Sequence, residues 1–410
     1  MPASIVVVGA GILGCTAALL AADRGHSVRV LDRAARPWSG ASAAGEGKVH
    51  LGLIYALGDA STQRHILEGA LSFSRVLDRA ADAQLPWADL VGEPFLNVVM
   101  PSSMLSADDL AERYRELDER FQQSDLAAGA SYLGQPLKRL HEPGLVTEHL
   151  TGLPALRVAE RAVETTRLRR LLVDRMLQHP LIEFALGREV LALHDLPDAV
   201  DVQHRDAADP QATIRKEHAD VVLNCSWEMR SALHADTEAP PLSFRYKAAL
   251  SIPLDAIDPV TCRTMTFVIG PFGDVVRRAN DVYVSWYPSG RIIHEHGIAP
   301  SIEARALVAS LDSAHPTVGE QLDALAAVGA LPHLDAAARH RVSLSGGWIL
   351  AEGSSDIDAR DSGLHQRRNG LIAQRGRVLS PRNWKLSTAP LAAQRSVDAV
   401  ESLLTDDVLT

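Results

Sequence analysis

The amino-acid sequence predicts an α/β fold in which a nucleotide-binding domain with a parallel β-sheet is interrupted by an inserted, mainly antiparallel β-sheet. A glycine-rich turn between a strand and a helix, within residues 4–32, predicts the nucleotide-binding part. Short apolar runs at 182–193 and 219–226 predict further strands of that part. Strand patterns at 246–252 and 264–287 are separated by turns, which favours an antiparallel sheet.

The glycine-rich turn has the full context of a dinucleotide-binding motif. A β-branched run ends at Gly9, a helical pattern follows, and an acidic residue, Asp32, ends the next strand at the expected distance of about 20 residues. Gly9 permits a tight turn, Gly11 lets a pyrophosphate approach the backbone, and Gly14 lets the helix pack close to the strand. Free N–H groups at the helix start receive phosphates. An ordinary strand–turn–helix with chance glycines is the alternative.

Composition excludes several classes of protein. The 410 residues suffice for two or more domains, and 46% hydrophobic with 22% charged residues fits a globular enzyme. A net charge of −10 argues against nucleic-acid binding. The three cysteines lie far apart, so neither a disulfide framework nor a zinc site is expected. Without a long apolar stretch or signal segment, we expect a cytoplasmic protein that does not associate with membranes.

A second stretch of small residues, 39–47, runs directly into Lys48-Val49-His50-Leu51-Gly52. Small side chains would let the backbone approach another part of a bound cofactor, although a flexible surface loop is the alternative reading. Helical spacing predicts helices elsewhere, and the second of them begins after the cap candidate Ser106. The predicted helices are 62–83, 106–123, 166–178, 301–312, 317–328 and 389–404.

The sequence resembles the FAD-dependent oxidoreductases of the D-amino acid oxidase superfamily, and among them relatives of glycine oxidase and L-2-hydroxyglutarate oxidase. Residues 9–32 resemble the segment that binds the ADP half of FAD, and 42–52 the loop beside the flavin. Residues 187–190 resemble the strand that meets the adenine, and 219–231 a further cofactor-binding segment. Trp227 stands where the family usually has glycine.

Two more departures concern the flavin and the substrate. The family's glycine-rich stretch before the last helix is replaced by 380–388, and its usual Gly-x-Arg-Pro segment is replaced by 351–356. The helix capped by Thr388 would direct its dipole at the flavin pyrimidine in such proteins. Loss of the Gly-x-Arg-Pro segment leaves the usual substrate-binding arginine of the amine oxidases unassigned.

The resemblance implies a Rossmann-like FAD-binding domain of the D-amino acid oxidase type, formed by 1–90, 150–235 and 345–410. The substrate-binding domain would comprise 91–149 and 236–344. FAD would be bound non-covalently, since no attachment motif is present. The residues expected to contact it are Gly9, Gly11, Ile12, Leu13, Gly14, Asp32, Arg33, Ser42, Ala43, Val190, Cys225, Leu386, Ser387 and Thr388.

The implied reaction is oxidation of the C–N bond of an amino acid or N-substituted amine, by hydride transfer to the flavin with O2 as acceptor and release of H2O2. A 2-hydroxy acid oxidase or dehydrogenase is the alternative, and a subunit that binds FAD without redox chemistry is the second alternative. The partner is a small-molecule substrate. The sequence does not identify that substrate, its stereochemistry or the oligomeric state.

Candidate residues for chemistry come from the second small-residue loop and from the antiparallel sheet. We expect His50 to act as a base for an alcohol substrate and Lys48 to place positive charge near the flavin during oxygen reduction. Arg245, Tyr246, Tyr287 and Arg291 are expected to bind substrate, since arginine binds carboxylates bidentately, and Tyr287 also completes the catalytic set. The histidines of 294–296 lack further ligands, so no metal site is predicted.

Overall fold

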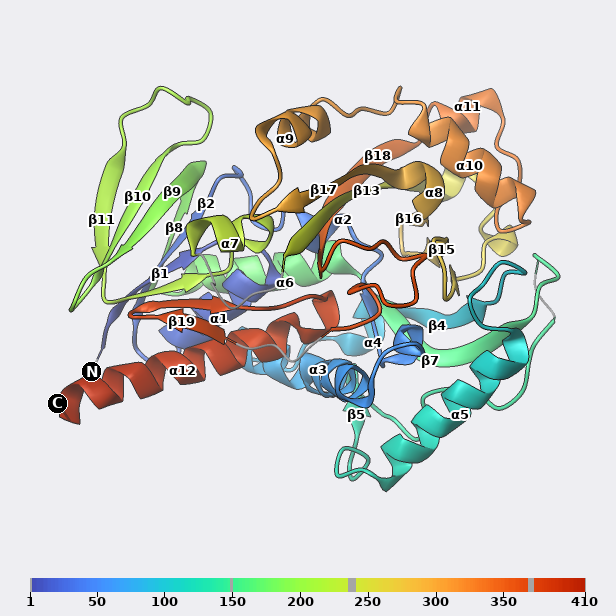
Figure 1. Cartoon of the computed structure of the whole chain (residues 1–410), viewed down its shortest axis with the longest axis horizontal. Helices are drawn as coiled ribbons and strands as arrows, with labels where there is room; N and C mark the ends of the chain where they lie inside the picture. The colour runs from blue at the N-terminus through green and yellow to red at the C-terminus, as the bar shows by residue number, and fades with distance from the viewer. Residues whose placement is uncertain (1, 148–149, 235–240, 368–371, 410) are drawn as a thin grey trace.

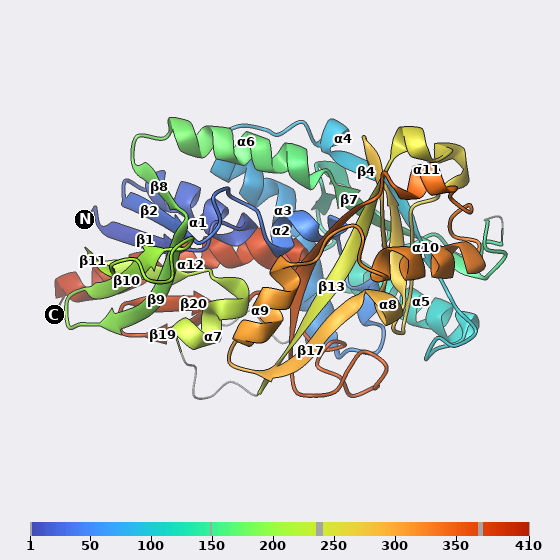
Figure 2. The same ribbon diagram turned by 90° about the horizontal axis from the view of Figure 1, so that it is seen from above.

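The structure, a computed structural model, describes residues 2–147, 150–234, 241–367 and 372–409. Two large sheets organise this part of the chain. Figures 1 and 2 show a parallel sheet with its helices at one end of the molecule and a larger antiparallel sheet at the other. The predicted fold class is confirmed.

The parallel sheet has the strand order β19-β20-β12-β1-β2-β8, and every pairing except β19 with β20 is parallel. Three separated stretches of sequence contribute to it, as the strand patterns predicted. Its strands are β1 (Ser4–Val8), β2 (Ser27–Asp32), β8 (Ile182–Leu186), β12 (Val221–Asn224), β19 (Ile372–Arg375) and β20 (Val378–Pro381).

Both faces of the parallel sheet are covered, which explains the continuous apolar run in β1. Successive side chains of a strand point to opposite faces. Ile5 and Val7 therefore join the core beneath the helices, whereas Val6 and Val8 pack against a separate three-stranded sheet. The helices are α1 (Ile12–Ala22), α3 (Ala60–Ala81), α6 (Thr165–Gln178) and α12 (Ala389–Leu409), and the small sheet is β9 (Arg188–Asp195), β10 (Val200–Asp206) and β11 (Arg215–Ala219).

The large antiparallel sheet has the order β17-β13-β16-β15-β14-β4-β7-β3, with β18 paired to the free side of β13. Only β14 and β4 pair in parallel. The strands are β3 (Lys48–Val49), β4 (Val91–Val98), β7 (Ala155–Val163), β13 (Leu242–Pro253), β14 (Met265–Phe267), β15 (Gly273–Arg277), β16 (Asp281–Trp286), β17 (Arg291–Gly297) and β18 (Ser343–Glu352).

The boundaries of this sheet differ from the predicted segments. Strands β3, β7 and most of β18 lie in ranges that the sequence assigned to the FAD-binding part, yet they pair in the antiparallel sheet. The division into five segments therefore stays a prediction. As a consequence, β3, which carries Lys48, forms the edge of the antiparallel sheet. The loop that precedes β3 contains residues predicted to contact the cofactor.

The remaining helices lie around the two sheets. Ser106 caps α5 as predicted, because its hydroxyl accepts a hydrogen bond from the Asp109 N–H at 3.1 Å. Helix α10 packs on α8 and β16. The bounds are α2 (Ala41–Ala44), α4 (Trp87–Leu90), α5 (Ala107–Gln123), α7 (Arg230–Leu233), α8 (Tyr287–Gly290), α9 (Ile302–Ala309), α10 (Thr317–Ala327) and α11 (Ala336–Arg339), with the two-stranded β5 (Ser131–Tyr132) and β6 (Gln135–Pro136).

The turn from β1 into α1 depends on two glycines. Gly9 has a φ of +105°, and a Cβ there would lie 2.5 Å from the carbonyl oxygen of Cys225. A Cβ on Gly14 would lie 1.9 Å from the carbonyl oxygen of Gly9. The helix can therefore start close to the strand only because both positions lack a side chain.

We expect Gly14→Ala to lower the free energy of unfolding by at least about 1–3 kcal/mol, because the new methyl group overlaps rigid backbone. Chemical denaturation of the apoprotein measures this. Gly45→Ala is the matched control, since its φ is −83° and a Cβ there meets only ordinary contacts at 3.7 Å. Equal stabilities of the two variants would contradict the close packing of α1 on the β1–α1 turn.

Candidate active site

A first cavity, of about 270 Å³, lies at the carboxyl ends of β1, β2 and β12. Crevices at this edge of a parallel sheet are where dinucleotides bind. Most of the predicted cofactor residues line it. They are Gly9, Gly11, Ile12, Leu13, Asp32, Arg33, Ser42, Val190, Cys225 and Leu386.

The start of α1 faces this cavity. Gly11 is the N-cap residue and offers no side-chain cap, and the N–H of Ile12 donates to the Ser42 hydroxyl at 3.0 Å. Asp32 accepts the N–H groups of Ala10 at 2.6 Å and Ala34 at 2.7 Å. The carboxylate is thereby fixed at the end of β2 and borders the cavity, where it could accept hydrogen bonds from the ribose of a bound dinucleotide.

Four predicted cofactor residues lie elsewhere. Gly14 packs against the turn, and Ala43 is exposed and lines neither cavity. The Ser387 hydroxyl accepts the N–H of His50 at 2.7 Å. The Thr388 hydroxyl donates to Asn383 Oδ1 at 2.6 Å and so closes the loop before α12. Gly14, Ser387 and Thr388 therefore support the site from outside the two cavities, whereas Ala43 lies on the surface.

Two tryptophans stand where the first cavity meets a second one. Trp227 and Trp384 line both cavities. Trp227 has a φ of 53°, a left-handed conformation that is uncommon outside glycine, and its indole N–H donates to the Trp348 carbonyl at 2.9 Å. The backbone therefore keeps the shape that suits the family's glycine, while an aromatic ring occupies the junction.

The second cavity, of about 280 Å³, lies between the loop at 41–50 and the face of the antiparallel sheet. The residues that line both cavities are Ala41, Ser42, Trp227, Trp384, Lys385 and Leu386, so the two are contiguous. Lys48, His50 and Tyr287, the three predicted catalytic residues, all line the second cavity. The structure thus brings together the sequence candidates that come from distant segments.

Lys48 forms a fully buried ion pair in the wall of this cavity. Its ammonium lies 2.8 Å from Glu160, and both side chains are 0% exposed. The ammonium also donates to Thr266 at 3.1 Å and lies 4.1 Å from the centre of the Phe95 ring. Burial alone would raise the pKa of Glu160, but the charge of Lys48, with His50 nearby, outweighs it and lowers that pKa to about 2.

His50 lies between two carboxylates. Its Nε2 is 3.6 Å from Glu46, its Nδ1 is 3.9 Å from Glu160, and the side chain is 4% exposed. Neither ring nitrogen has a hydrogen-bond partner among the described residues. Although burial raises the pKa of Glu46, His50, Lys247 and Lys385 together hold it well below its usual range. Glu46 is therefore an anion at the cavity wall.

A second ionic pair lies on the sheet. The Lys247 ammonium donates to Asp274 at 3.1 Å, and Thr266 and Ser285 donate to the same carboxylate. Burial opposes the charge of Lys247, but the carboxylates of Asp274 and Glu46 raise its pKa overall. Burial also raises the pKa of Tyr283 to about 12. The lysine thus stays cationic and the phenol neutral.

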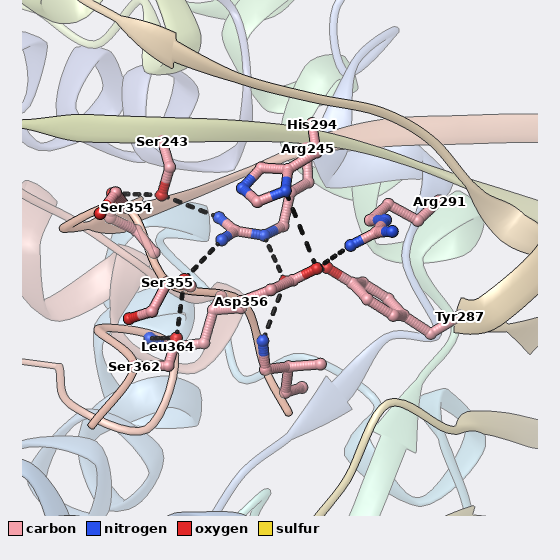
Figure 3. Close-up of polar contacts among 12 residues, drawn as sticks. Ser243, Arg245, Tyr287, Arg291, His294, Ser354, Ser355, Asp356, Ser362 and Leu364 are labelled. Carbon is pink, nitrogen blue, oxygen red and sulfur yellow. Dashed lines mark hydrogen bonds and ion pairs between the residues drawn. The ribbon is translucent and has the colours of Figure 1, made fainter. Parts of the chain in front are cut away.

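Three of the predicted substrate ligands from the sheet bind a carboxylate of the protein itself, Asp356. Arg245 is 0% exposed and donates to Asp356 at 2.7 Å, and Tyr287 and Arg291 bind the same carboxylate (Figure 3). Arg245 also donates to the Ser355 carbonyl at 2.8 Å. Neither arginine lines the first or the second cavity. Arg245 and Arg291 therefore do not fit the predicted role of substrate ligands, because Asp356 already satisfies their charges.

The cluster around Asp356 fastens a loop over the second cavity. Ile357, Leu364, His365 and Arg367 of this loop line the cavity. The Asp356 carboxylate has a pKa of about 2, because burial is outweighed by hydrogen bonds from Tyr287 and Arg245. Tyr287 both binds Asp356 and lines the cavity, so the loop and the sheet are joined at the cavity wall.

Tyr246 also lies outside the cavity lining. Its ring packs on Trp348, with the ring centres 5.4 Å apart, over the space that Gly346 leaves open.

Sequence reasoning missed Arg367 and Tyr55, which line the second cavity and are buried. Neither lies in a recognisable motif, so only the fold could bring them to the site. Lys247 could have been predicted from the sequence, because it lies two residues after Arg245 and so shares its face of the strand.

The comparison with protein families matches residues 4–355 to the family described as DAO, FAD dependent oxidoreductase. The chain belongs to this family. It is therefore an FAD-dependent oxidoreductase, as the resemblance implied. The comparison with curated proteins gives no match.

Several solved structures share the fold of this chain. Glycine oxidase from Geobacillus kaustophilus aligns with a TM-score of 0.63 and 14% identity, over 98% of this chain and 95% of that one. L-amino acid deaminase from Proteus vulgaris gives 0.61 and 14%, over 98% and 94%. Glycerol-3-phosphate dehydrogenase from Bacillus halodurans, complexed with FAD, gives 0.53 and 15%, over 98% and 65%.

The residues of this DAO family member fit FAD. The uncapped helix start at Gly11 and the side chain of Ser42 suit a diphosphate, and Asp32 suits a ribose. The contiguous second cavity would then receive the flavin end. In the part of the chain that the structure describes, no helix is long and apolar enough to cross a membrane, and no group of three or more His, Cys, Asp or Glu side chains could hold a metal.

We expect Asp356→Asn to destabilise the protein by about 3 kcal/mol at neutral pH, because it leaves the buried Arg245 without a counter-charge. The pKa of Asp356 falls from an ordinary 3.8 to about 2 in the folded state. Its contribution is therefore complete above pH 3.8 and is lost as the pH falls toward 2. The difference between wild type and variant should shrink by on the order of 2 kcal/mol over that interval.

Denaturant titrations at several pH values measure this difference. Asp255→Asn is the control, because Asp255 pairs with Arg341 on the surface and should have little effect. Stability curves of wild type and Asp356→Asn that run parallel through the acidic range would refute the role of Asp356.

Proposed function

We propose that this enzyme oxidises the C–N bond of an amino acid or N-substituted amino acid, with O2 as electron acceptor and H2O2 as product. The observation that carries the proposal is the charge pattern of the second cavity. A buried guanidinium, Arg367, and a carboxylate, Glu46, line the same space. An amino acid carries the complementary carboxylate and amine.

Arg367 is suited to bind a substrate carboxylate. Its side chain is 3% exposed, and it has no carboxylate partner among the described residues. One Nη donates to the Leu350 carbonyl at 2.8 Å, while Nε is buried and has no hydrogen-bond partner in the described part. The guanidinium lies 5.9 Å from the centre of the Trp384 ring. Because an unpaired buried charge is costly, an anion in the cavity would stabilise it.

Glu46 and His50 are suited to the amine. An ammonium must lose a proton before the carbon beside it can give up a hydride, since the nitrogen lone pair forms the new C=N bond. Glu46 is held as a carboxylate and can bind an ammonium. His50, with two ring nitrogens that lack hydrogen-bond partners among the described residues, can accept its proton.

FAD supplies the hydride acceptor when bound. The substrate then loses a hydride from carbon and a proton from nitrogen to give an imine, which water can hydrolyse. O2 takes up the two electrons and two protons as H2O2. We keep Lys48 as the predicted positive charge for oxygen reduction, although its pairing with Glu160 reduces the net charge that it presents.

The relatives with solved structures support an amino acid substrate. One is glycine oxidase, a second is L-amino acid deaminase, and a third, NikD, is described as an unusual amino acid oxidase. NikD aligns with a TM-score of 0.57 and 15% identity over 97% of this chain. We propose oxidation of an amino acid for this chain too, because Arg367 and Glu46 place complementary charges in the second cavity.

A 2-hydroxy acid is the second candidate, and the position of His50 favours it. An imidazole flanked by two carboxylates is the arrangement expected of a base that removes a hydroxyl proton. The carboxylate of a 2-hydroxy acid would suit Arg367 equally well. The two candidates therefore differ in what Glu46 contacts, an ammonium or an uncharged hydroxyl.

We expect amino acids or N-substituted amino acids to bleach the flavin absorbance of the purified enzyme under anaerobic conditions. Admission of air should restore the absorbance and release H2O2 in proportion to the substrate consumed. A panel of amino acids, simple amines and 2-hydroxy acids tests the substrate class. Faster bleaching by 2-hydroxy acids, or recovery without peroxide, would overturn the corresponding part of the proposal.

We expect Arg367→Met to lower kcat/KM for the best amino acid by about 100-fold, because the substrate carboxylate loses its charged partner. The same amine without a carboxylate should be oxidised by wild type and variant at similar rates. Arg367→Lys, which keeps the charge, should recover part of the loss. An equal loss for both substrates would show that Arg367 acts on the fold of the site rather than on the carboxylate.

A further inference from the structure

Arg230, at the start of α7, is a buried cation in the first cavity. It lies within the segment 219–231, but the sequence assigned it no contact of its own. It is 5% exposed and lines the cavity together with Gly11 and Ile12. It has no carboxylate within ion-pair distance among the described residues, and its Nη1 is buried there without a hydrogen-bond partner. Arg33, which lines the same cavity, is by contrast paired with Glu228.

The surroundings of Arg230 make its charge costly. Its guanidinium lies 5.9 Å from the centre of the Trp384 ring. Burial and the nearby charge of Arg382 lower its pKa to about 10, and the carboxylate of Glu352 opposes this only in part. A buried guanidinium in such a place requires an anion that the described side chains do not supply.

The position of Arg230 along the site identifies that anion. Asp32 and Val190 line the first cavity alone, where the adenosine end of FAD would lie, and the second cavity would receive the flavin. Trp384 lines both cavities and therefore marks the middle of the path. The middle of an FAD molecule is its diphosphate, which carries two negative charges.

We propose that Arg230 binds the diphosphate of FAD and works together with the start of α1. Backbone N–H groups of α1 provide dipoles for the phosphates, and the guanidinium provides the full positive charge that a helix start lacks. The proposal rests on the cofactor alone and holds for any substrate of the enzyme.

Titration of the full-length apoprotein with FAD, ADP and adenosine tests the proposal. Arg230→Met should weaken FAD and ADP binding by about 30-fold, the expected size of a lost hydrogen bond to a charged group. Adenosine, which lacks the diphosphate, should bind wild type and variant alike. Arg230→Lys should restore part of the affinity for ADP. Arg175→Met is the control for the loss of one positive charge, because Arg175 pairs with Asp23 on the surface.

The rate at which FAD leaves the purified holoenzyme on dilution provides a second readout that does not need a folded apoprotein. Flavin fluorescence reports the release, which should be faster for Arg230→Met and less sensitive to added salt than in wild type. Unchanged ADP affinity, or an equal loss of affinity for adenosine, would overturn the proposal. So would FAD release at the wild-type rate from the variant.

Discussion

The buried ion pair between Lys48 and Glu160 is the constraint on which the site depends. Lys48 lies on β3 and Glu160 on β7, and the other oxygen of Glu160 accepts the N–H of Leu51 at 2.7 Å. One carboxylate therefore fixes both ends of the segment that carries His50. The N–H of His50 in turn donates to Ser387 before α12. Loss of either charge would leave the other buried and unpaired, a defect that typically costs about 3–5 kcal/mol.

The buried cations around the two cavities are of two kinds, those that pair with a carboxylate of the protein and those that do not. Lys48, Lys247 and Arg245 each have a carboxylate partner within 3.1 Å, and each holds a strand or loop in place. Arg230 and Arg367 have none among the described residues, and both lie 5.9 Å from the Trp384 ring. Since the protein leaves these two charges unmatched beside open space, ligand anions are the groups that complete them.

The sequence predicted the parts of the site whose function depends on backbone geometry. The β1–α1 turn was readable because only glycine fits at Gly9 and Gly14. The sequence did not predict the roles of charged side chains whose partners come from distant segments. Arg245 had the right residue type on the right strand, but Asp356, more than a hundred residues later, engages it. The strands β10 and β11 were missed as well, although Val200 and Val202 alternate with polar residues as a half-buried strand requires.

Trp227 holds a backbone conformation that glycine adopts more easily than other residues. Its left-handed backbone, with a φ of 53°, costs a residue with a Cβ about 1–2 kcal/mol, and glycine would avoid that cost. The hydrogen bond from its indole to the Trp348 carbonyl recovers only part of this, since such a bond contributes about 1 kcal/mol. The indole ring also packs against the apolar cluster that contains Trp348 and Trp384, and this burial offsets the rest of the cost. The indole ring lies at the junction of the two cavities, which Trp384 also lines. The side chain of Trp227 therefore shapes the passage through which a bound cofactor would extend from one cavity into the other.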